Sequence, residues 1–373
     1  MGITNLLPIL APISHRNVSL YSYKGKRIAI DGFVWLHRAS YRCAREIVLD
    51  PGTDAIIPIV MQKLERLQKS GVIPIIVFDG KSLPQKANTT LKRRSERAKA
   101  KEDAILLDNQ GFSEQALRHF QRAIEITSVT VHNWIKHLKK VGVEYIVAPY
   151  EADAQLAYLC RTKYVDFVLT EDSDLLPYQT PHILYKYDEF SQTATYVNFQ
   201  EVLNHFQLTA DQFIAICCLS GCDYMEHINR LGFQTALKLI KIHKEPLELL
   251  NFLRSDPKFT VPEDYHIQLD NAMLTFKAQK VFDPKTKTLQ NLIPIDSSPE
   301  FLGPEIPSDI LPLLVKGLID TKTNEKLVFV APESPQPDRP HSTITPEVEV
   351  KETAPVSKYF NSYRLVNLNL CIH

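Results

Sequence analysis

One stretch of the chain, residues 145–174, combines a short structural unit with acids in a regular pattern. The apolar run 145–148 predicts a strand, the alanine- and leucine-rich run 152–160 predicts a helix, and 166–170 predicts a second strand. Together they form a βαβ unit, and two acids at i, i+2 spacing follow each strand. In an open parallel sheet, ligands bind at this edge. The acids are Glu151, Asp153, Asp172 and Asp174.

The same arrangement, an apolar strand followed by an acid, occurs twice more, earlier in the chain. Residues 27–30 lead into Asp31, and residues 74–78 lead into Asp79. A single aspartate at the end of a strand is usually a helix N-cap or a turn residue. Four aspartate or glutamate residues at one sheet edge are much less commonly explained as four separate caps. We therefore expect their carboxylates to lie close together in one site.

Carboxylates that share one crevice repel each other and take up protons unless cations neutralise them. Sites built from oxygen ligands suit hard ions such as Mg²⁺ or Mn²⁺. Two such ions about 4 Å apart can activate water and stabilise a leaving oxygen in phosphodiester hydrolysis. A solvated acidic surface is the alternative, and placement at strand ends argues against it.

The 373-residue chain has no net charge, so its overall composition does not indicate a nucleic-acid binder. Basic residues are concentrated in one polar segment in which Glu96 is the only acid. A solvated helix face or a nuclear-localisation signal would explain this segment. Beside a metal site, a phosphate-binding helix is the better interpretation. The basic residues are Lys86, Lys92, Arg93, Arg94, Arg97, Lys99 and Lys101.

The cysteines indicate reduced core thiols of an intracellular protein. Its six cysteines form no CxxC pair, as in proteins of reducing compartments, and we expect neither a signal peptide nor a membrane span. Residues 114–140 have helical spacing, with every apolar position expected in the core. We also expect a helix to stop at residues 282–284. The apolar positions are Ala116, Leu117, Phe120, Ile124, Val131, Trp134, Ile135 and Leu138.

A helix predicted over residues 208–219, with Thr209 as its N-cap, is followed by a turn and a second helix that carries Lys238 and Lys241. Such a pair of helices can present backbone amides to a phosphate, although an ordinary helical hairpin explains the spacing equally well. Proline, serine, threonine and glutamate dominate after Ala331, which predicts a disordered tail. An aromatic pair near its end occurs in Ser357, Lys358, Tyr359 and Phe360.

With these features in place, the chain resembles the flap-endonuclease-like 5′-nuclease superfamily, and most of all its exonuclease 1 branch. The resemblance covers about residues 1–284 and extends weakly to residue 326. Tyr150 and Asp153 favour exonuclease 1 over flap endonuclease. The motifs are MGITNLLP, DGFVWLH, VFDGKSLPQK, APYEADAQLAYL, TEDSDLL, LSGCDY and VPEDY.

The resemblance implies an α/β fold of the PIN-like type, with a mostly parallel twisted sheet flanked by helices. It implies a nuclease core over 1–283, with a helical arch at about 80–130 and a helix–two-turn–helix element at about 208–242. An extension over 284–328 would pack on the core. The tail, 329–373, would carry a docking peptide at 355–360.

The resemblance also implies roles for individual residues. Lys86 and Arg93 match arch residues that contact the scissile phosphate; with Asp172 and Asp174 they would be catalytic. The first of two Mg²⁺ ions, for which Mn²⁺ can substitute, would be held by Asp31, Asp79, Glu151 and Asp153. The second would be held by Asp172, Asp174 and Asp223, with Glu151 and Asp153 near the bridge. DNA contacts are implied for Gly2, Phe33, His37, Lys92, Arg94, Arg97, Arg230, Gly232, Lys238 and Lys241.

The chain departs from the family pattern at three places. Phe33 replaces a common tyrosine, which keeps stacking and loses a hydroxyl contact. Arg230 replaces the first glycine of a hairpin that binds DNA with the help of K⁺; at positive φ an arginine is strained, though it can add a phosphate contact. The tail lacks a clear sliding-clamp box, and Ser357–Phe360 instead resembles a peptide that docks on a MutL homologue, with Val356 replacing the usual leading basic residue.

The sequence therefore predicts an Mg²⁺-dependent 5′→3′ exonuclease for double-stranded DNA with 5′-flap endonuclease activity. Its substrates would be DNA with 5′ ends, nicks, gaps or flaps. We expect a nuclear monomer, without a membrane partner, that works in mismatch repair and end resection. The alternatives are a replicative flap endonuclease and a non-catalytic DNA-binding scaffold. The presence of all seven acids argues against the scaffold.

Overall fold

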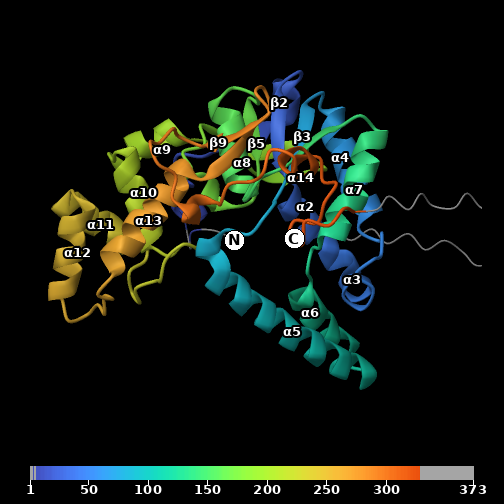
Figure 1. Ribbon diagram of the computed structural model, residues 1–373, viewed down its shortest axis with the longest axis horizontal. Coiled ribbons are helices and arrows are strands. Elements are labelled where there is room, and N and C mark those ends of the chain that lie inside the picture. Colours follow the sequence, from blue (N-terminus) through green and yellow to red (C-terminus); the bar gives the residue numbers. More distant parts are fainter. Residues whose placement is uncertain (1–2, 4–5, 328–373) are drawn as a thin grey trace, which may run out of the picture. The chain divides into compact units, whose positions relative to one another are not determined.

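The structure is a computed structural model that describes residue 3 and residues 6–327. The chain separates into two units, Met1–Val328 and Phe329–His373, and the description below concerns the first unit (Figure 1). Gly2, the predicted tail and the peptide Ser357–Phe360 lie outside the described residues. The division of the chain into core, extension and tail stays a prediction.

The centre of the first unit is a seven-stranded sheet with the order β1-β7-β6-β5-β2-β3-β4. From β6 to β4 all neighbours are parallel, whereas β7 pairs antiparallel with both β6 and β1. The strands are β1 (His15–Ser19), β2 (Arg27–Asp31), β3 (Ile73–Phe78), β4 (Glu144–Val147), β5 (Phe167–Leu169), β6 (His182–Asp188) and β7 (Thr193–Asn198). The mostly parallel α/β sheet confirms the predicted fold class.

Strand order decides where the acids meet. The two strands of the predicted βαβ unit, β4 and β5, are separated in the sheet by β3 and β2. All four are parallel, so their carboxyl ends share one edge. β2 and β3 are almost wholly buried apolar runs, as expected for central strands covered on both faces.

Two separate groups of helices pack on the sheet (Figure 1). Helix α8 (Ala152–Arg161) lies across β2, β3 and β5, and its many alanines allow the backbones to approach closely. Against β3 and β4 lie α2 (Gly32–Ser40), α4 (Ile57–Lys69) and α7 (Ser128–Lys140). The remaining short helices before α8 are α1 (Leu6–Ile9) and α3 (Ala44–Leu49).

Helices α5 (Ala87–Asn109) and α6 (Ser113–Ala123) pair with each other and extend away from the sheet (Figure 1). A small apolar cluster joins them to α3, and it includes Ala100, Ala104 and Phe120. The helical spacing predicted for residues 114–140 is confirmed, but the expected burial of Leu117 was wrong. The segment is two helices, because the chain leaves α6 after Ala123 and Thr127 caps α7, and Leu117 is 43% exposed because Ala116 and Phe120 face the seam.

The later part of the first unit is mainly helical. Thr209 caps α10 through a capping box with Gln212, which confirms the predicted N-cap. In the turn before α11, Arg230 has φ 69°, so the arginine does occupy a left-handed position. The helices are α9 (Phe199–Phe206), α10 (Ala210–Leu219), α11 (Phe233–His243), α12 (Pro246–Ser255), α13 (Tyr265–Ala278) and α14 (Leu311–Val315).

The helix expected to stop at residues 282–284 in fact ends earlier, at Ala278. The chain then forms β8 (Lys280–Asp283), which pairs with β9 (Thr288–Asn291). The buried side-chain amide of Gln155 donates to the Phe282 carbonyl and accepts from its N–H, both at 2.8 Å. The Gln155 side chain therefore hydrogen-bonds the β8 backbone in the way a neighbouring strand would. Sequence periodicity cannot predict such a contact.

Several short features complete the described part. The 3₁₀ turns are η1 (Leu20–Tyr23), η2 (Tyr41–Cys43), η3 (Pro84–Lys86), η4 (Ser173–Leu175) and η5 (Glu300–Leu302). Cysteines 43, 160, 217, 218 and 222 form no disulfide. None of the described helices is both long enough and apolar enough to cross a bilayer.

Gly80 fixes the loop after β3 against the turn that begins α8. Its N–H donates to the Tyr150 carbonyl at 2.6 Å. A Cβ on Gly80 would lie 1.8 Å from the Ala148 carbonyl oxygen, and a backbone atom cannot move aside easily. We therefore predict that Gly80→Ala lowers the free energy of unfolding by about 2 kcal/mol or more, the scale of overpacking in a tight site.

Chemical denaturation with Gly52→Ala as the matched control checks this prediction. A Cβ on Gly52 meets its nearest atom, Asp50 Oδ1, at an ordinary 3.4 Å. The control should stay within ~0.5 kcal/mol of the parent protein. Equal stability of the two variants would contradict the prediction.

Candidate active site

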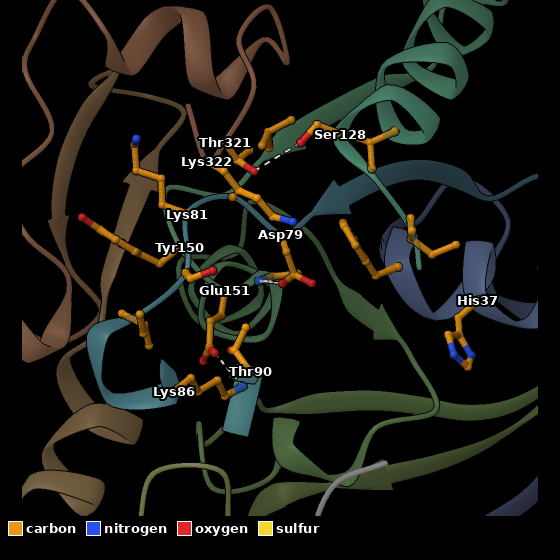
Figure 2. A pocket seen from close by; sticks show the side chains of 18 of the residues that line it. His37, Asp79, Lys81, Lys86, Thr90, Ser128, Tyr150, Glu151, Thr321 and Lys322 are labelled. Atoms are coloured by element: carbon orange, nitrogen blue, oxygen red, sulfur yellow. Dashed lines mark hydrogen bonds and ion pairs between the residues drawn. The ribbon is translucent and has the colours of Figure 1, made fainter. Parts of the chain in front are cut away.

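A cleft of about 630 Å³ lies at the carboxyl edge of the parallel strands (Figure 2). All seven acids singled out from the sequence line it, and among its basic lining residues are Lys86, from η3, and Arg93, from α5. The acids are Asp31, Asp79, Glu151, Asp153, Asp172, Asp174 and Asp223.

Three of these acids are held by backbone N–H groups. Asp31 caps α2 by accepting from Val34 N at 3.0 Å, and Asp172 caps η4 by accepting from Asp174 N at 3.1 Å. Asp79 accepts from Ala152 N, at the start of α8, at 2.7 Å. The ordinary role of a strand-end aspartate as a cap therefore applies here as well, and it fixes each carboxylate in the cleft.

The buried acids hold protons more tightly than ordinary carboxyl groups. Burial and the neighbouring charge of Asp79 raise the pKa of Asp31 to about 7. Burial also raises the pKa of Asp79 to about 6, and burial with the charge of Asp172 raises that of Asp174 to about 8. Burial and repulsion by Asp172 raise the pKa of Asp153 as well. The cleft thus lacks enough positive charge for its carboxylates.

Lys86 and Arg93 supply part of that charge. Lys86 Nζ lies 2.5 Å from Glu151 Oε1 and 3.3 Å from Asp223 Oδ2, and Figure 2 shows the Lys86 and Glu151 side chains pointing at each other. Burial alone would lower the pKa of Lys86, but Glu151 and Asp223 outweigh it and raise that pKa. Arg93 Nη2 donates to both oxygens of Asp223, at 3.0 and 3.1 Å.

The donor set of the cleft fits hard divalent cations. The ligand candidates are carboxylate oxygens, and Asp153 Oδ1 and Asp174 Oδ1 are buried with no hydrogen-bond partner among the described residues. Within that same part of the chain, no three His, Cys, Asp or Glu side chains already stand in ligand geometry around one point. The site is therefore a cluster of repelling acids that Lys86 and Arg93 partly neutralise.

The other predicted site residues divide into two sets. Phe33, His37 and Arg97 line the cleft, and His37 lies well apart from Lys86 (Figure 2). Burial and the charge of Arg97 lower the pKa of His37. Lys92 and Arg94 are exposed on α5, whereas Arg230 and Gly232 precede α11 and Lys238 and Lys241 are exposed on it; none of these six is among the lining residues.

Sequence reasoning missed two groups of residues. Tyr178, Tyr224 and Gln279 hydrogen-bond Glu151 from beneath the cleft. Thr321 and Lys322, from the segment after α14, line the cleft near Ser128. Tyr224 follows Asp223 in the LSGCDY motif, so the sequence could have indicated it. No periodicity or motif indicates Tyr178, Gln279, Thr321 or Lys322.

Comparison with known proteins now decides the family. Two family models match, the XPG N-terminal domain over residues 1–100 and the XPG I-region over residues 142–223. The DNA damage-inducible protein DIN7 of Saccharomyces cerevisiae is 33% identical over 297 residues, which are 78% of this chain and 69% of that protein. The chain belongs to the XPG nuclease family. The predicted resemblance is confirmed.

Further relatives place the chain in the exonuclease 1 branch of this family. Exodeoxyribonuclease 1 of Schizosaccharomyces pombe is 36% identical over 298 residues, covering 79% of this chain and 52% of that protein. The chain spans about half the length of the curated exonucleases that it matches. The catalytic core of Rad2 in complex with DNA substrate has the same fold, with TM-score 0.56 and 19% identity over 73% of this chain and 85% of that one.

The raised pKa values generate a prediction about pH. The folded protein binds these protons more tightly than the unfolded chain, in which an aspartate titrates near 3.8. The resulting stability is fully present below about pH 4 and is lost as pH rises through the folded pKa values of about 6, 7 and 8. The melting temperature in EDTA should therefore fall across this window, and Mg²⁺ should offset the fall by replacing the protons.

Thermal melting at several pH values, with EDTA or with Mg²⁺, measures this effect. In EDTA, Asp174→Asn should reduce the fall in melting temperature at the highest pH values, since it removes the group with the highest of the three pKa values. Asp188→Asn is the control, because Asp188 is exposed and hydrogen bonds lower its pKa instead. A melting temperature in EDTA that stays level or rises above pH 6 would contradict the assignment.

Proposed function

We propose that this chain is an Mg²⁺-dependent, structure-selective 5′→3′ exonuclease for double-stranded DNA that also cuts 5′ flaps. The proposal includes action as a nuclear monomer in mismatch repair and end resection, on DNA with 5′ ends, nicks, gaps or flaps. Membership of the exonuclease 1 branch supports it. The observation that carries it is the convergence of all seven acids with Lys86 and Arg93 in one cleft.

In the proposed reaction, Asp31, Asp79, Glu151 and Asp153 hold one cation, and Asp172, Asp174 and Asp223 hold the other. Bound divalent cations supply activated water and stabilise the leaving oxygen of the phosphodiester. Lys86 and Arg93 reach the cleft from the segment that starts α5, so they can turn from Asp223 to a substrate phosphate. Phe33 and His37 line the same cleft, where a terminal nucleotide can stack.

The second DNA-binding region of the proposal is the helix–two-turn–helix formed by α10 and α11. Lys238 and Lys241 are exposed on α11, as phosphate contacts require. Arg230 keeps the left-handed backbone that glycine adopts easily, which supports a retained turn with an added cationic side chain. A K⁺ ion at this turn is part of the proposal. Lys92, Arg94 and Arg97 would bind further phosphates from α5.

Asp172→Ala tests the proposed chemistry. We predict that cleavage of a 5′-recessed duplex falls by about 10²–10³-fold or more, because a charged group that stabilises the transition state is lost. Binding to the same DNA, measured by fluorescence anisotropy, should persist. Asp188→Ala, which removes an exposed acid, should cleave normally. Full cleavage by Asp172→Ala would disprove the two-metal assignment.

A panel of DNA structures separates the rival functions. An exonuclease prefers nicked, gapped or recessed duplexes, whereas a replicative flap endonuclease prefers a long free flap and responds to a sliding clamp. A non-catalytic scaffold binds these DNAs and cuts none of them with Mg²⁺ or Mn²⁺. Omission of the metal from one arm shows whether cleavage depends on it.

The tail supplies a separate part of the proposal, docking on a MutL homologue through Ser357, Lys358, Tyr359 and Phe360. We predict that a peptide over residues 355–360 binds the C-terminal domain of a MutL homologue, and that Phe360→Ala abolishes binding because an aromatic anchor is lost. Isothermal titration calorimetry measures both. Absence of binding by the unaltered peptide at high micromolar concentration would refute the docking role.

A further inference from the structure

Glu151 is held differently from the other acids of the cleft. Its backbone caps α8, but its side chain makes no capping bond and points toward Tyr178, Tyr224 and Gln279. Tyr178 Oη donates to Glu151 Oε2 at 3.1 Å, Gln279 Nε2 donates to the same oxygen at 3.0 Å, and Tyr224 Oη donates to it as well. The other oxygen, Oε1, contacts Lys86 Nζ at 2.5 Å.

The three partners of Glu151 Oε2 are all hydrogen-bond donors. Each tyrosine hydroxyl has one proton to donate, and Gln279 Nε2 directs an N–H at the same oxygen, so Glu151 Oε2 accepts from three neighbouring donors. The hydroxyls of Tyr178 and Tyr224 lie 2.5 Å apart, and Gln279 Nε2 also donates to Tyr178 Oη at 3.1 Å. The amide oxygen of Gln279 is buried without a partner among the described residues, which costs free energy. The side chain nevertheless directs its nitrogen toward Glu151.

Helix α13 and its C-terminal cap hold these partners in place. Phe276, on the last turn of α13, contacts the rings of both Tyr178 and Tyr224 edge to face, with ring centres 5.0 and 4.9 Å apart. Gln279 follows three residues later. Tyr178 and Gln279 are fully buried, and Tyr224 is nearly so. The group therefore has little room to rearrange.

We propose that Tyr178, Tyr224 and Gln279 are positioning residues that reserve one oxygen of Glu151 for themselves and leave only Oε1 to bind a cation. This inference rests on the proposed function, and it adds a hydrogen-bonded layer behind the metal ligands. Oε2 is saturated by donors, so Glu151 acts as a one-oxygen ligand. Outer partners of this kind orient a ligand.

The proposal gives Lys86 a defined place. Its ammonium group now contacts the one oxygen that Glu151 has free, and it lies 5.1 Å from the centre of the Tyr224 ring. A cation that binds Glu151 must therefore share or displace Lys86 at Oε1. Movement of Lys86 toward a substrate phosphate would leave that oxygen available.

Binding of Mn²⁺ to the EDTA-treated full chain, measured by calorimetry, tests the proposal without any cleavage. Tyr224→Phe and Gln279→Leu each remove donors to Oε2 and nearly preserve volume. Each should weaken Mn²⁺ binding about 10-fold or more, the usual effect of losing an outer partner. The Mg²⁺ concentration for half-maximal cleavage should rise by a similar factor, with the rate recovering at saturating metal.

Tyr185→Phe is the matched control. Tyr185 is equally buried, and its hydroxyl bonds to no group in the described part of the chain. It should bind Mn²⁺ like the parent protein. Tyr178→Phe, which deletes a single oxygen, provides a third variant, and melting curves in EDTA confirm that each variant is folded. Folded Tyr224→Phe and Gln279→Leu proteins with parental Mn²⁺ affinity would overturn the proposal.

The two measurements, Mn²⁺ binding and DNA cleavage, separate this inference from the proposed function. If the parent protein binds Mn²⁺ and cuts no DNA, the proposed function fails, and weakened binding by the variants still supports the positioning role. If the parent protein cuts DNA and the variants retain parental Mn²⁺ affinity, the positioning role fails alone. A parent protein that binds no Mn²⁺ would overturn both.

Discussion

Repulsion among buried carboxylates is the constraint on which the rest of this structure depends. The parallel order β5-β2-β3-β4 brings their strand ends to one edge, and burial there strengthens every unfavourable interaction between like charges. The protein holds the acids in place with backbone N–H groups and with Lys86 and Arg93. It retains protons where these partners do not suffice. The clustered carboxylates therefore favour the binding of cations, which a neutral pocket would not.

The positive charge that faces these acids comes from a different structural element. Lys86 ends η3 and Arg93 lies on α5, a helix whose contacts are mainly with α6 rather than with the sheet. Few buried apolar side chains tie α5 to the core, so its position depends in part on ion pairs with Glu151 and Asp223. Any cation or phosphate that enters the cleft competes for those same pairs, which couples the helix to occupancy of the site.

The sequence predicted the strand-end acids because strand period and edge geometry are local signals. Asp223 required the family resemblance, since it follows a helix and not a strand. Gln279 was beyond reach: it lies 128 residues from Glu151, and only packing of α13 brings them together. The strand β8 was missed for a similar reason, because the Gln155 side chain supplies part of its pairing. Contacts between distant side chains leave no periodic trace.

The start of α8 has one more consequence, which concerns the length of the chain. Within six residues it is attached at four places, through the Tyr150 carbonyl, Ala152 N, the Glu151 carboxylate and the Gln155 amide. These attachments point toward different elements, and one inserted residue rotates all that follows by about 100° around the helix axis. An insertion or deletion here would therefore detach several partners at once. The length of this turn is constrained as tightly as the residue types at Glu151 and Gln155.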